Sequence, residues 1–233
     1  MNKQVLIFGA SGGLGQELMN IFLSNNHKII ATTSKNTNIF KLRKKFKEFN
    51  KKKIEWNLCD LKKENQIIKI INKYFKKNTC PEIVIICSGV FKYNILKKLD
   101  YRNLIDDFKI NLFSNIIINK QILNKKIKNK KVTIVNIGSS SSYYGFKNTI
   151  SYCASKHGLL GAVKAINDEC KKNKIFNTCV SMGSMKTKMG KKVRNQEYRN
   201  FIDPQKIAKY IFDITANNME AYVEEIFFKR SKL

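Results

Sequence analysis

A tyrosine and a lysine four residues apart are the pair best suited to chemistry in this chain. They lie in the segment Tyr152-Cys153-Ala154-Ser155-Lys156, and Ser139 precedes the tyrosine by 13 positions. Residues four apart share one face of a helix, so the phenol and the ammonium group can share a proton-transfer task. Tyr-x-x-x-Lys recurs by chance in a lysine-rich chain, so its weight depends on the motifs around it.

A glycine-rich loop follows the first apolar run, Val5 to Phe8. It reads Gly9-Ala10-Ser11-Gly12-Gly13-Leu14-Gly15. A strand that leads through such a loop into a helix presents backbone N–H groups and the positive end of the helix to a pyrophosphate. A tight turn, a close approach to phosphate and tight helix packing all favour residues that lack a side chain. Together with the Tyr-Lys pair, the loop indicates an enzyme.

Short apolar runs alternate with longer amphipathic segments along the whole chain. The pattern predicts seven strands, at Val5–Phe8, Lys28–Thr33, Ile54–Asn57, Ile83–Cys87, Val132–Ile137, Thr178–Met182 and Tyr222–Phe228. It predicts helices at Leu14–Ser24, Asn38–Phe49, Glu64–Phe75, Tyr101–Leu123, Ser151–Lys172 and Pro204–Ala216. Almost wholly apolar strands joined by helical crossovers predict a parallel sheet covered on both faces. The expected fold is therefore a doubly wound α/β Rossmann fold with a seven-stranded parallel sheet.

The chain shows no linker, internal repeat or low-complexity block, so we expect a single domain over residues 1–233. One long polar connection, at about residues 184–201, follows the sixth predicted strand. In this fold, ligands bind outside the carboxyl ends of the strands. We therefore interpret this connection as a lid over the substrate, with a purely solvated loop as the alternative.

With these motifs in place, the chain resembles the classical short-chain dehydrogenase/reductase superfamily over nearly its whole length. The family has a T-G-x-x-x-G-x-G loop, and here Phe8 replaces the threonine. Asn111 in Ile110-Asn111-Leu112 and Ser139 in the run Val135 to Ser141 fall at the family's catalytic positions, and Ser140 and Ser141 remain alternatives to Ser139. The resemblance implies a catalytic tetrad of Asn111, Ser139, Tyr152 and Lys156.

The resemblance also assigns a role to each member of this tetrad. Tyr152 protonates the substrate oxygen, and Lys156 favours the phenolate and bonds the nicotinamide ribose. Ser139 donates a hydrogen bond to the substrate oxygen as negative charge develops. Asn111 holds a water molecule that links Lys156 to solvent. All four roles are filled, which predicts an active reductase.

Cofactor contacts follow from the resemblance in the same way. The family's N-N-A-G appears here as Ile86-Cys87-Ser88-Gly89, so the two asparagines that brace this strand end are missing, which bears on local rigidity rather than chemistry. The family's P-G-x-x-x-T-x-M appears as the run Met182 to Met189, with only the proline replaced. The implied cofactor-binding residues are Gly9, Ser11, Gly12, Gly13, Leu14, Gly15, Thr33, Ser34, Lys35, Asp60, Leu61, Ser88, Gly89, Tyr152, Lys156, Gly183, Met185 and Thr187.

The end of the second predicted strand favours NADP over NAD. Ala31-Thr32-Thr33-Ser34-Lys35 contains no carboxylate to pair with the ribose 2′-hydroxyl group. A carboxylate there would repel a 2′-phosphate, whereas the Thr33 and Ser34 hydroxyl groups and the Lys35 ammonium group can bond it. The alternative interpretation is an ordinary polar strand end.

The predicted activity is NADPH-dependent reduction of a carbonyl compound that is small or linked to a nucleotide or sugar. The alternative is a non-catalytic NADP-binding sensor or scaffold of the same fold. We expect substrate contacts around Val90–Leu96, Tyr143–Ile150 and Ser184–Phe201. The two long helices Tyr101–Leu123 and Ser151–Lys172 commonly form the family's subunit interface, so the resemblance implies a homodimer or homotetramer.

Composition limits the other classes of function. The net charge is +28, but lysines scattered along the chain supply 40 of the 45 basic residues, which is unlike the arginine-rich surfaces that read nucleic-acid bases. The six cysteines and two histidines form no ligand cluster, so we expect no metal and no disulfide. No run is long enough to span a membrane, and we expect a cytoplasmic protein. The final Ser231-Lys232-Leu233 leaves a peroxisomal location as the alternative in a eukaryotic host.

Overall fold

The centre of the molecule is a seven-stranded sheet in which every neighbouring pair of strands is parallel. The computed structural model describes residues 2–49, 51–76, 79–125, 130–216 and 221–231. The strand order is β3-β2-β1-β4-β5-β6-β7. The bounds are β1 (Gln4–Phe8), β2 (Lys28–Thr33), β3 (Ile54–Leu58), β4 (Ile83–Ile86), β5 (Val132–Ile137), β6 (Ile175–Met182) and β7 (Glu225–Phe228).

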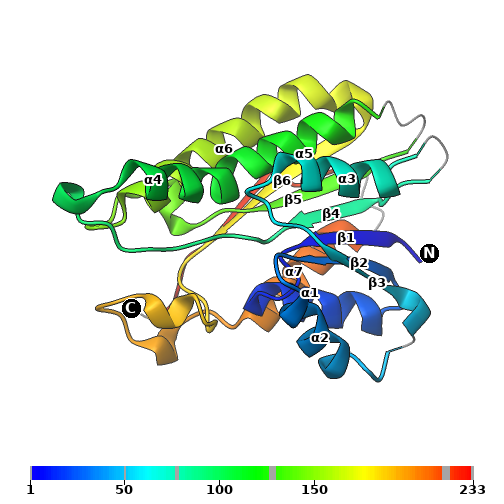
Figure 1. The fold of residues 1–233 in the computed structure, drawn as a ribbon, viewed down its shortest axis with the longest axis horizontal. Coiled ribbons are helices and arrows are strands. Elements are labelled where there is room, and N and C mark those ends of the chain that lie inside the picture. The colour runs from blue at the N-terminus through cyan, green and yellow to red at the C-terminus, as the bar shows by residue number, and fades with distance from the viewer. Residues whose placement is uncertain (1, 50, 77–78, 126–129, 217–220, 232–233) are drawn as a thin grey trace.

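Helices cover both faces of this sheet (Figure 1). The first layer holds α3 (Glu64–Tyr74), α4 (Tyr101–Phe108), α5 (Ser114–Leu123) and α6 (Ile150–Cys170), and the second holds α1 (Gly13–Ser24), α2 (Asn36–Lys45) and α7 (Pro204–Ala216). The predicted doubly wound α/β Rossmann fold with a seven-stranded parallel sheet is thereby confirmed.

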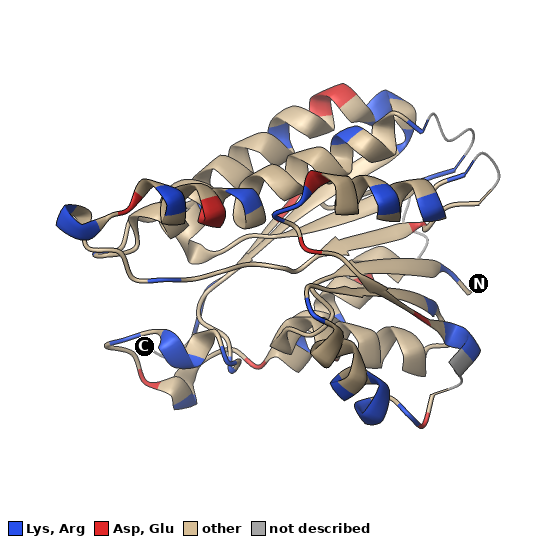
Figure 2. Ribbon diagram, in the orientation of Figure 1, with Lys and Arg blue, Asp and Glu red and all other residues tan. Residues whose placement is uncertain are grey.

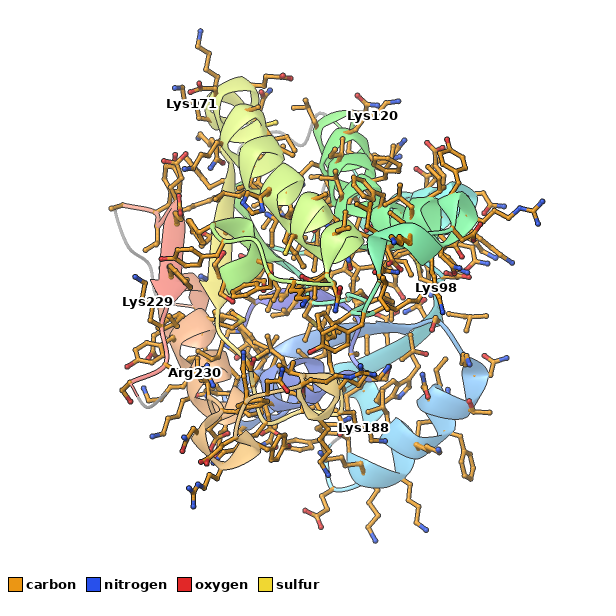
Figure 3. All side chains as sticks on the ribbon, turned by 90° about the vertical axis from the view of Figure 1, so that its left-hand side faces the viewer. Lys98, Lys120, Lys171, Lys188, Lys229 and Arg230 are labelled. Atoms are coloured by element: carbon orange, nitrogen blue, oxygen red, sulfur yellow. The ribbon has the colours of Figure 1, made fainter. Side chains whose placement is uncertain are left out.

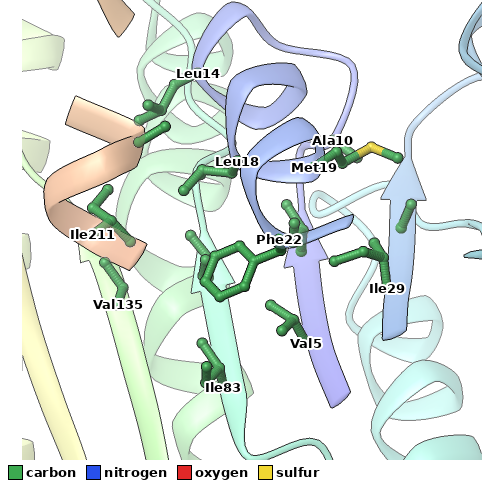
Figure 4. Close-up of a cluster of buried hydrophobic side chains, with 14 of the residues drawn as sticks. Val5, Ala10, Leu14, Leu18, Met19, Phe22, Ile29, Ile83, Val135 and Ile211 are labelled. Carbon is green, nitrogen blue, oxygen red and sulfur yellow. The ribbon is translucent and has the colours of Figure 1, made fainter. Parts of the chain in front are cut away.

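The alternation of side chains along β1 explains why two layers are needed. Val5 and Ile7 belong to the apolar cluster shared with α1 and α7, part of which Figure 4 shows around Phe22. Leu6 and Phe8 belong to a separate cluster with α3 and α5. All four side chains are completely buried, and burial of each stabilises the fold by about 1.5–3 kcal/mol. A strand that is apolar on both sides is stable only between two helical layers.

Several element boundaries differ from the sequence-based expectation; β7, for example, starts at Glu225 rather than Tyr222. β6 starts at Ile175 rather than Thr178 because Asn177, which interrupts the apolar pattern, forms buried hydrogen bonds with Asn167 and Asn136. α2 ends at Lys45, before the predicted end at Phe49. The helix predicted over Tyr101–Leu123 is continuous in space, but α4 and α5 are joined by a π-helical turn, Lys109–Phe113.

Basic residues are spread over the molecule (Figure 2), and the cysteines are unpaired. Figure 2 shows lysine and arginine residues on the helices of both layers rather than on one face. All six cysteines are free thiols. Within the described ranges, no helix has the length and apolar character of a membrane span, and no group of three or more His, Cys, Asp or Glu residues forms a metal site. Lys232 and Leu233 of the C-terminal tripeptide lie outside the described residues.

Candidate functional site

A pocket of about 1310 Å³ lies at the carboxyl ends of the strands. Its centre is the point where the strand order reverses, between β1 and β4. Phe8 and Ile86 are register partners at the ends of these strands, so the loops that follow them lie side by side. Gly9, with φ of +88°, lies against Ser88, where an added Cβ would approach the Ser88 Oγ to 2.5 Å and its backbone N to 2.7 Å. Only glycine fits this position without strain.

The glycine loop continues directly into α1. Gly12 caps the helix with its backbone only, so no side chain occupies the N–H groups of the first turn. An added Cβ at Gly13 would lie 2.6 Å from the Thr187 Cγ2, so the connection interpreted as a lid in the sequence, residues 184–201, packs against this loop. An added Cβ at Gly15 would lie 2.3 Å from the carbonyl oxygen of Gly9. Gly15 therefore does not line the pocket, and it serves the packing of α1 against the loop.

The residues after β2 and β3 line the adenosine side of the expected cofactor site. Ser34 and Lys35 are exposed at the pocket, whereas the Thr33 hydroxyl group donates to the Lys35 carbonyl oxygen at 2.9 Å. Thr33 therefore shapes this turn, and its proton is already engaged. The carboxylate of Asp60 accepts a hydrogen bond from the Lys62 backbone N at 3.1 Å, which fixes the turn that carries Leu61.

Ser139 forms the start of a short 3₁₀ turn, Ser140–Ser142, after β5. Its Oγ accepts a hydrogen bond from the Ser141 backbone N at 3.1 Å, and its backbone N donates to the Ser142 Oγ at 3.2 Å. The run of serines is therefore an ordered turn. Because the Ser139 oxygen already accepts a bond, its hydroxyl proton is available to a neighbour, and the Tyr152 phenol is within hydrogen-bond reach.

Tyr152 and Lys156 lie one helical turn apart on α6, and both line the pocket. The Lys156 Nζ donates to the Ile137 carbonyl oxygen at 2.7 Å and lies 5.9 Å from the centre of the Tyr152 ring. Burial lowers the pKa of Lys156 from 10.5 to about 8. Burial also raises the pKa of Tyr152, although its hydrogen bond with Ser139 acts in the opposite direction. The pKa of Tyr152 therefore moves in the direction opposite to the one expected from a neighbouring lysine charge, because burial is the largest cause of the shift and Lys156 is not among its causes.

Asn111 is completely buried in the π-helical turn and does not line the pocket. Its side chain brackets the backbone of Val90: the Oδ1 accepts from the Val90 N at 2.9 Å, and the Nδ2 donates to the Val90 O at 3.0 Å. The Nδ2 also donates to the Ser155 Oγ at 3.1 Å, on the same helix as the Tyr-Lys pair. Asn111 therefore connects the loop after β4 to α6.

The strand end that lacks the two customary asparagines is braced by a thiol. The Cys87 Sγ donates to the carbonyl oxygen of Phe8 at 3.1 Å and lies 3.6 Å from that of Gly9. Burial raises the pKa of Cys87 to about 12, so the thiol keeps its proton and remains a donor. The bracing that the missing asparagines would provide is thus supplied in part by Cys87, which stands in place of one residue of the family's N-N-A-G motif.

The loop after β4 and the lid contact each other across the mouth of the pocket. Phe91 packs edge-on against the Tyr152 ring, with centroids 5.0 Å apart, and Tyr93 packs edge-on against Phe91 at 5.2 Å. The Tyr93 hydroxyl oxygen accepts a hydrogen bond from the backbone N of Arg194, which lies in the lid, at 2.7 Å. The base of the lid is fixed by a bridge between Met185 and Ile202.

A buried carboxylate supports the start of α6. Asp107, on α4, accepts a hydrogen bond from Ser151, the residue before the tyrosine, at 2.8 Å. Lys92 lies 3.2 Å from the other oxygen of this carboxylate, and Asn94 contacts the Ser151 hydroxyl group at 2.8 Å. Three neighbouring residues of the loop after β4 thus contact three other segments: Lys92 contacts α4, Tyr93 contacts the lid, and Asn94 contacts α6.

The structure brings nearly all predicted site residues together around one pocket. The predicted residues that line it are Gly9, Ser11, Gly12, Gly13, Leu14, Thr33, Ser34, Lys35, Asp60, Leu61, Ser88, Gly89, Ser139, Tyr152, Lys156, Gly183, Met185 and Thr187. Gly15 and Asn111 lie behind it. The sequence pattern predicted substrate contacts in the loops that contain Phe91, Tyr93 and Arg194, but not these particular residues. Asp107 was not predicted either. Only the aromatic alternation Phe91-x-Tyr93 offered a signal.

Comparisons with known proteins agree with this geometry. The model of the family described as "short chain dehydrogenase" matches residues 3–198. The 3-oxoacyl-[acyl-carrier-protein] reductase FabG of Buchnera aphidicola from Schizaphis graminum is 28% identical over 200 residues, which are 86% of this chain and 80% of that protein. FabG of Rickettsia typhi is 26% identical over 95% of this chain and 92% of its own. Carbonyl reductase family member 4 of Xenopus laevis is 25% identical over 91% of this chain and 90% of its own.

Solved structures share the fold at lower sequence identity. The structure of ElxO with NADP bound has a TM-score of 0.85 and 21% identity, with 98% of each chain covered. The structure of 4-hydroxyisoleucine dehydrogenase complexed with NADH has a TM-score of 0.83 and 22% identity, also with 98% of each chain covered. The family match extends over most of the chain, and it agrees with the parallel sheet and with the grouping of the glycine loop and the Tyr-Lys pair at one pocket. The chain therefore belongs to the short-chain dehydrogenase family and is an oxidoreductase.

Proposed function

We propose that this protein reduces a carbonyl compound with NADPH, using Ser139, Tyr152 and Lys156 at the reacting end of the pocket and Asn111 behind it. The observation that carries the proposal is the convergence of a serine hydroxyl group, a partly buried phenol and a buried lysine in the pocket that also holds the glycine loop.

The pocket fits a nicotinamide dinucleotide. Gly9 and Gly13 keep the backbone open at the start of α1, whose first N–H groups have no side-chain cap. A helix end of this kind suits a pyrophosphate. Ser34 and Lys35 are exposed at the position expected for a ribose 2′-phosphate, and no carboxylate occurs there, which supports NADP over NAD. The known structures with this fold include complexes with both cofactors, so the preference rests on the residues after β2.

The side chains support a simple division of labour. When bound, the reduced nicotinamide supplies hydride to the carbonyl carbon. Tyr152 donates its proton to the carbonyl oxygen, and its raised pKa keeps the phenol protonated at neutral pH, as a general acid requires. Ser139 donates a hydrogen bond to the same oxygen as negative charge develops.

Two further residues support the acid. Lys156, with a pKa of about 8, still carries a proton at pH 7 and returns one to the phenol after each turnover. Asn111 holds the Val90 backbone and α6 at a fixed separation, which keeps Tyr152 opposite the loop after β4.

The relatives suggest where to look for the substrate. Several are named as reductases of 3-oxoacyl groups on acyl carrier protein, and one as a carbonyl reductase. A 3-oxoacyl thioester is therefore the first compound to test, ahead of the sugar-linked or nucleotide-linked carbonyl compounds suggested by the sequence.

We further propose that the protein is a homodimer or homotetramer that associates through α4, α5 and α6. Apolar side chains are exposed along α4, the π-helical turn and α5: Tyr101 at 73%, Phe113 at 42% and Ile116 at 37%. Such a row of apolar groups is typical of a surface that another protein covers. Light scattering after size-exclusion chromatography tests this, and a mass of about 27 kDa, that of one chain, would contradict it.

The proposed function is tested by calorimetric titration with NADPH and NADH at about 0.15 M salt, where unspecific charge attraction is screened. We expect saturable binding of both, with NADPH preferred. A matched control is Lys35→Gln, which should reduce the preference for NADPH without preventing NADH binding. Failure to bind either nucleotide would contradict the proposal. Tight binding without turnover of any carbonyl compound would favour the non-catalytic sensor or scaffold.

A further inference from the structure

We propose that Arg194 binds a phosphate or carboxylate group at the end of the substrate that is remote from the reacting carbonyl. This inference rests on the proposed reductase function and names the substrate class: a carbonyl compound that carries a negative charge. It comes from a row of side chains that leads from the catalytic phenol across the mouth of the pocket.

This row of side chains limits the distance between the catalytic phenol and the proposed anion site. From the Tyr152 ring, the steps are 5.0 Å to Phe91, 5.2 Å from Phe91 to Tyr93 and 4.8 Å from the Tyr93 ring to the Arg194 guanidinium carbon. These steps set an upper limit of about 15 Å on the separation between the centre of the Tyr152 ring and the Arg194 guanidinium carbon. All four side chains belong to residues that line the pocket. A substrate with its carbonyl at Tyr152 therefore reaches Arg194 if its charged group can come within about this distance of the carbonyl, which a longer flexible chain does by bending.

Arg194 is held in place but keeps its hydrogen-bonding capacity. Its backbone N is bonded to the Tyr93 hydroxyl oxygen, and its guanidinium group stacks over the same ring. Within the described ranges, no carboxylate pairs with this guanidinium group. Arg199, in the same lid, differs because it forms an ion pair with Glu197 at 2.6 Å. A positioned guanidinium group without a carboxylate presents a planar set of N–H donors that matches phosphate or carboxylate geometry.

The charge of the pocket supports an anionic ligand beyond the cofactor. The described lining contains eight lysine and arginine residues and one acidic residue, Asp60. The chain as a whole has 45 lysine and arginine residues and 17 acidic residues, so the lining is more basic than the average of the chain. Lys186 and Lys188 flank Thr187, which contacts Gly13, so they lie toward the pyrophosphate side, and Figure 3 shows Lys188 on that part of the lid. Arg194 lies on the other side, beside the loop after β4. The cofactor's own charges therefore do not account for it.

The choice of arginine adds an independent argument. Only five of the 45 basic residues are arginine, so lysine is the usual basic residue of this chain. Arg199, the other arginine of the lid, is explained by its ion pair with Glu197. Arg194 is the arginine of the lid that faces the pocket. A bidentate anion contact is the task that lysine performs least well.

The test compares substrates that differ by one phosphate. Acetoacetyl-4′-phosphopantetheine and acetoacetyl-pantetheine are reduced with NADPH, and kcat/KM is measured for each. We expect the wild type to prefer the phosphorylated compound by about 10-fold, mainly through KM, and the preference to shrink as salt is raised. Arg194→Gln should bring the ratio close to one, Arg194→Lys should keep part of it, and the matched control Arg199→Gln should keep all of it. Short methyl ketones that end in a carboxylate, compared with their methyl esters, distinguish a small oxo acid from a phosphopantetheine thioester.

The outcomes separate this inference from the reductase function. Equal kcat/KM for charged and neutral members of both series, with turnover intact, would overturn the Arg194 site and leave the reductase function standing. If no carbonyl compound is reduced, the reductase function fails, and calorimetric titration of the NADP-bound protein with phosphopantetheine decides the site. Binding that Arg194→Gln weakens about 10-fold would support it, and absence of binding, or equal binding by the variant, would reject it.

Discussion

The two halves of the pocket are built by different means. On the cofactor side, contacts between backbone atoms fix the residue types: Gly9 lies against Ser88, and Gly15 lies against the carbonyl oxygen of Gly9. On the substrate side, side chains from two loops fix one another: Phe91 and Tyr93 of the loop after β4, and Arg194 of the lid. Backbone constraints require glycine at fixed positions and so produce a strict sequence pattern. Side-chain contacts between loops can be made by many different pairs of residue types. The comparison explains why the cofactor and its binding residues follow from the sequence far more readily than the substrate does.

A large effect, second only to that of removing the Tyr152 hydroxyl group, is expected at the catalytic lysine between the two halves. Lys156→Met should reduce turnover by about 10²-fold or more, because proton return to the phenol is lost. The same change should increase the free energy of unfolding by about 1–3 kcal/mol at pH 7, since burial lowers the pKa of this lysine from 10.5 to about 8. Steady-state kinetics and urea unfolding measure the two effects.

The pH dependence of this stability gain has a definite sign. Below pH 8 the folded protein carries the buried charge at its full cost, so the gain from Lys156→Met is largest there. Between about pH 8 and 10.5 the unfolded chain binds a proton that the folded protein has lost, so the wild type becomes relatively more stable and the gain disappears. Wild-type reduction should likewise slow above about pH 8. A gain that is constant from pH 7 to 10.5 would show that the charge of Lys156 does not cause it.

The next effect concerns the backbone contacts of the cofactor half. Gly9→Ala should lower the free energy of unfolding by about 2–4 kcal/mol, because φ is +88° and the new Cβ would collide with the Ser88 backbone. NADPH binding should be lost as well. Gly145, where an added Cβ meets nothing within 4 Å, provides a control, and Gly145→Ala should change neither quantity measurably. Equal stability of the two variants would contradict a backbone origin for the glycine pattern.

A smaller effect is expected on the substrate side. Asp107→Asn should lower the free energy of unfolding by about 1–2 kcal/mol and reduce turnover severalfold, because the buried carboxylate holds Ser151 and Lys92 next to the start of α6. Since this residue positions Tyr152 and does not touch substrate, the loss should appear in kcat with little change in the Kd for NADPH. Lys171→Gln removes an exposed ion pair with Asp168 and should leave both values unchanged. A change in NADPH affinity alone would contradict the positioning role.

Particular residues show what the sequence could and could not predict. The strands β2 and β5 and the helix α7 have the predicted bounds, because apolar periodicity and the proline at the helix start are local signals. The bracing by Cys87 could not be predicted, because a thiol donates to the Phe8 carbonyl only in the folded arrangement of β1 and β4. The π-helical turn around Asn111 has no sequence period of its own.

The same distinction applies to the site. Spacing along the chain identified Ser139, Tyr152 and Lys156, since each follows a predictable strand or lies on one helix. It also placed Thr33 among the cofactor contacts, but its hydroxyl proton is used within the turn after β2. Arg194 depends on the position of a lid relative to Tyr93, 101 residues earlier, and no local pattern encodes such a contact.

The most direct test of the central claim is NADPH oxidation by wild type and Tyr152→Phe with acetoacetyl-pantetheine. The phenylalanine keeps the ring against Phe91 and removes only the hydroxyl group. We predict that turnover falls at least about 10³-fold while the Kd for NADPH changes less than about twofold, because the phenol acts as the acid in the reaction. Turnover within about 10-fold of the wild type would show that Tyr152 is not the acid and would contradict the proposed mechanism.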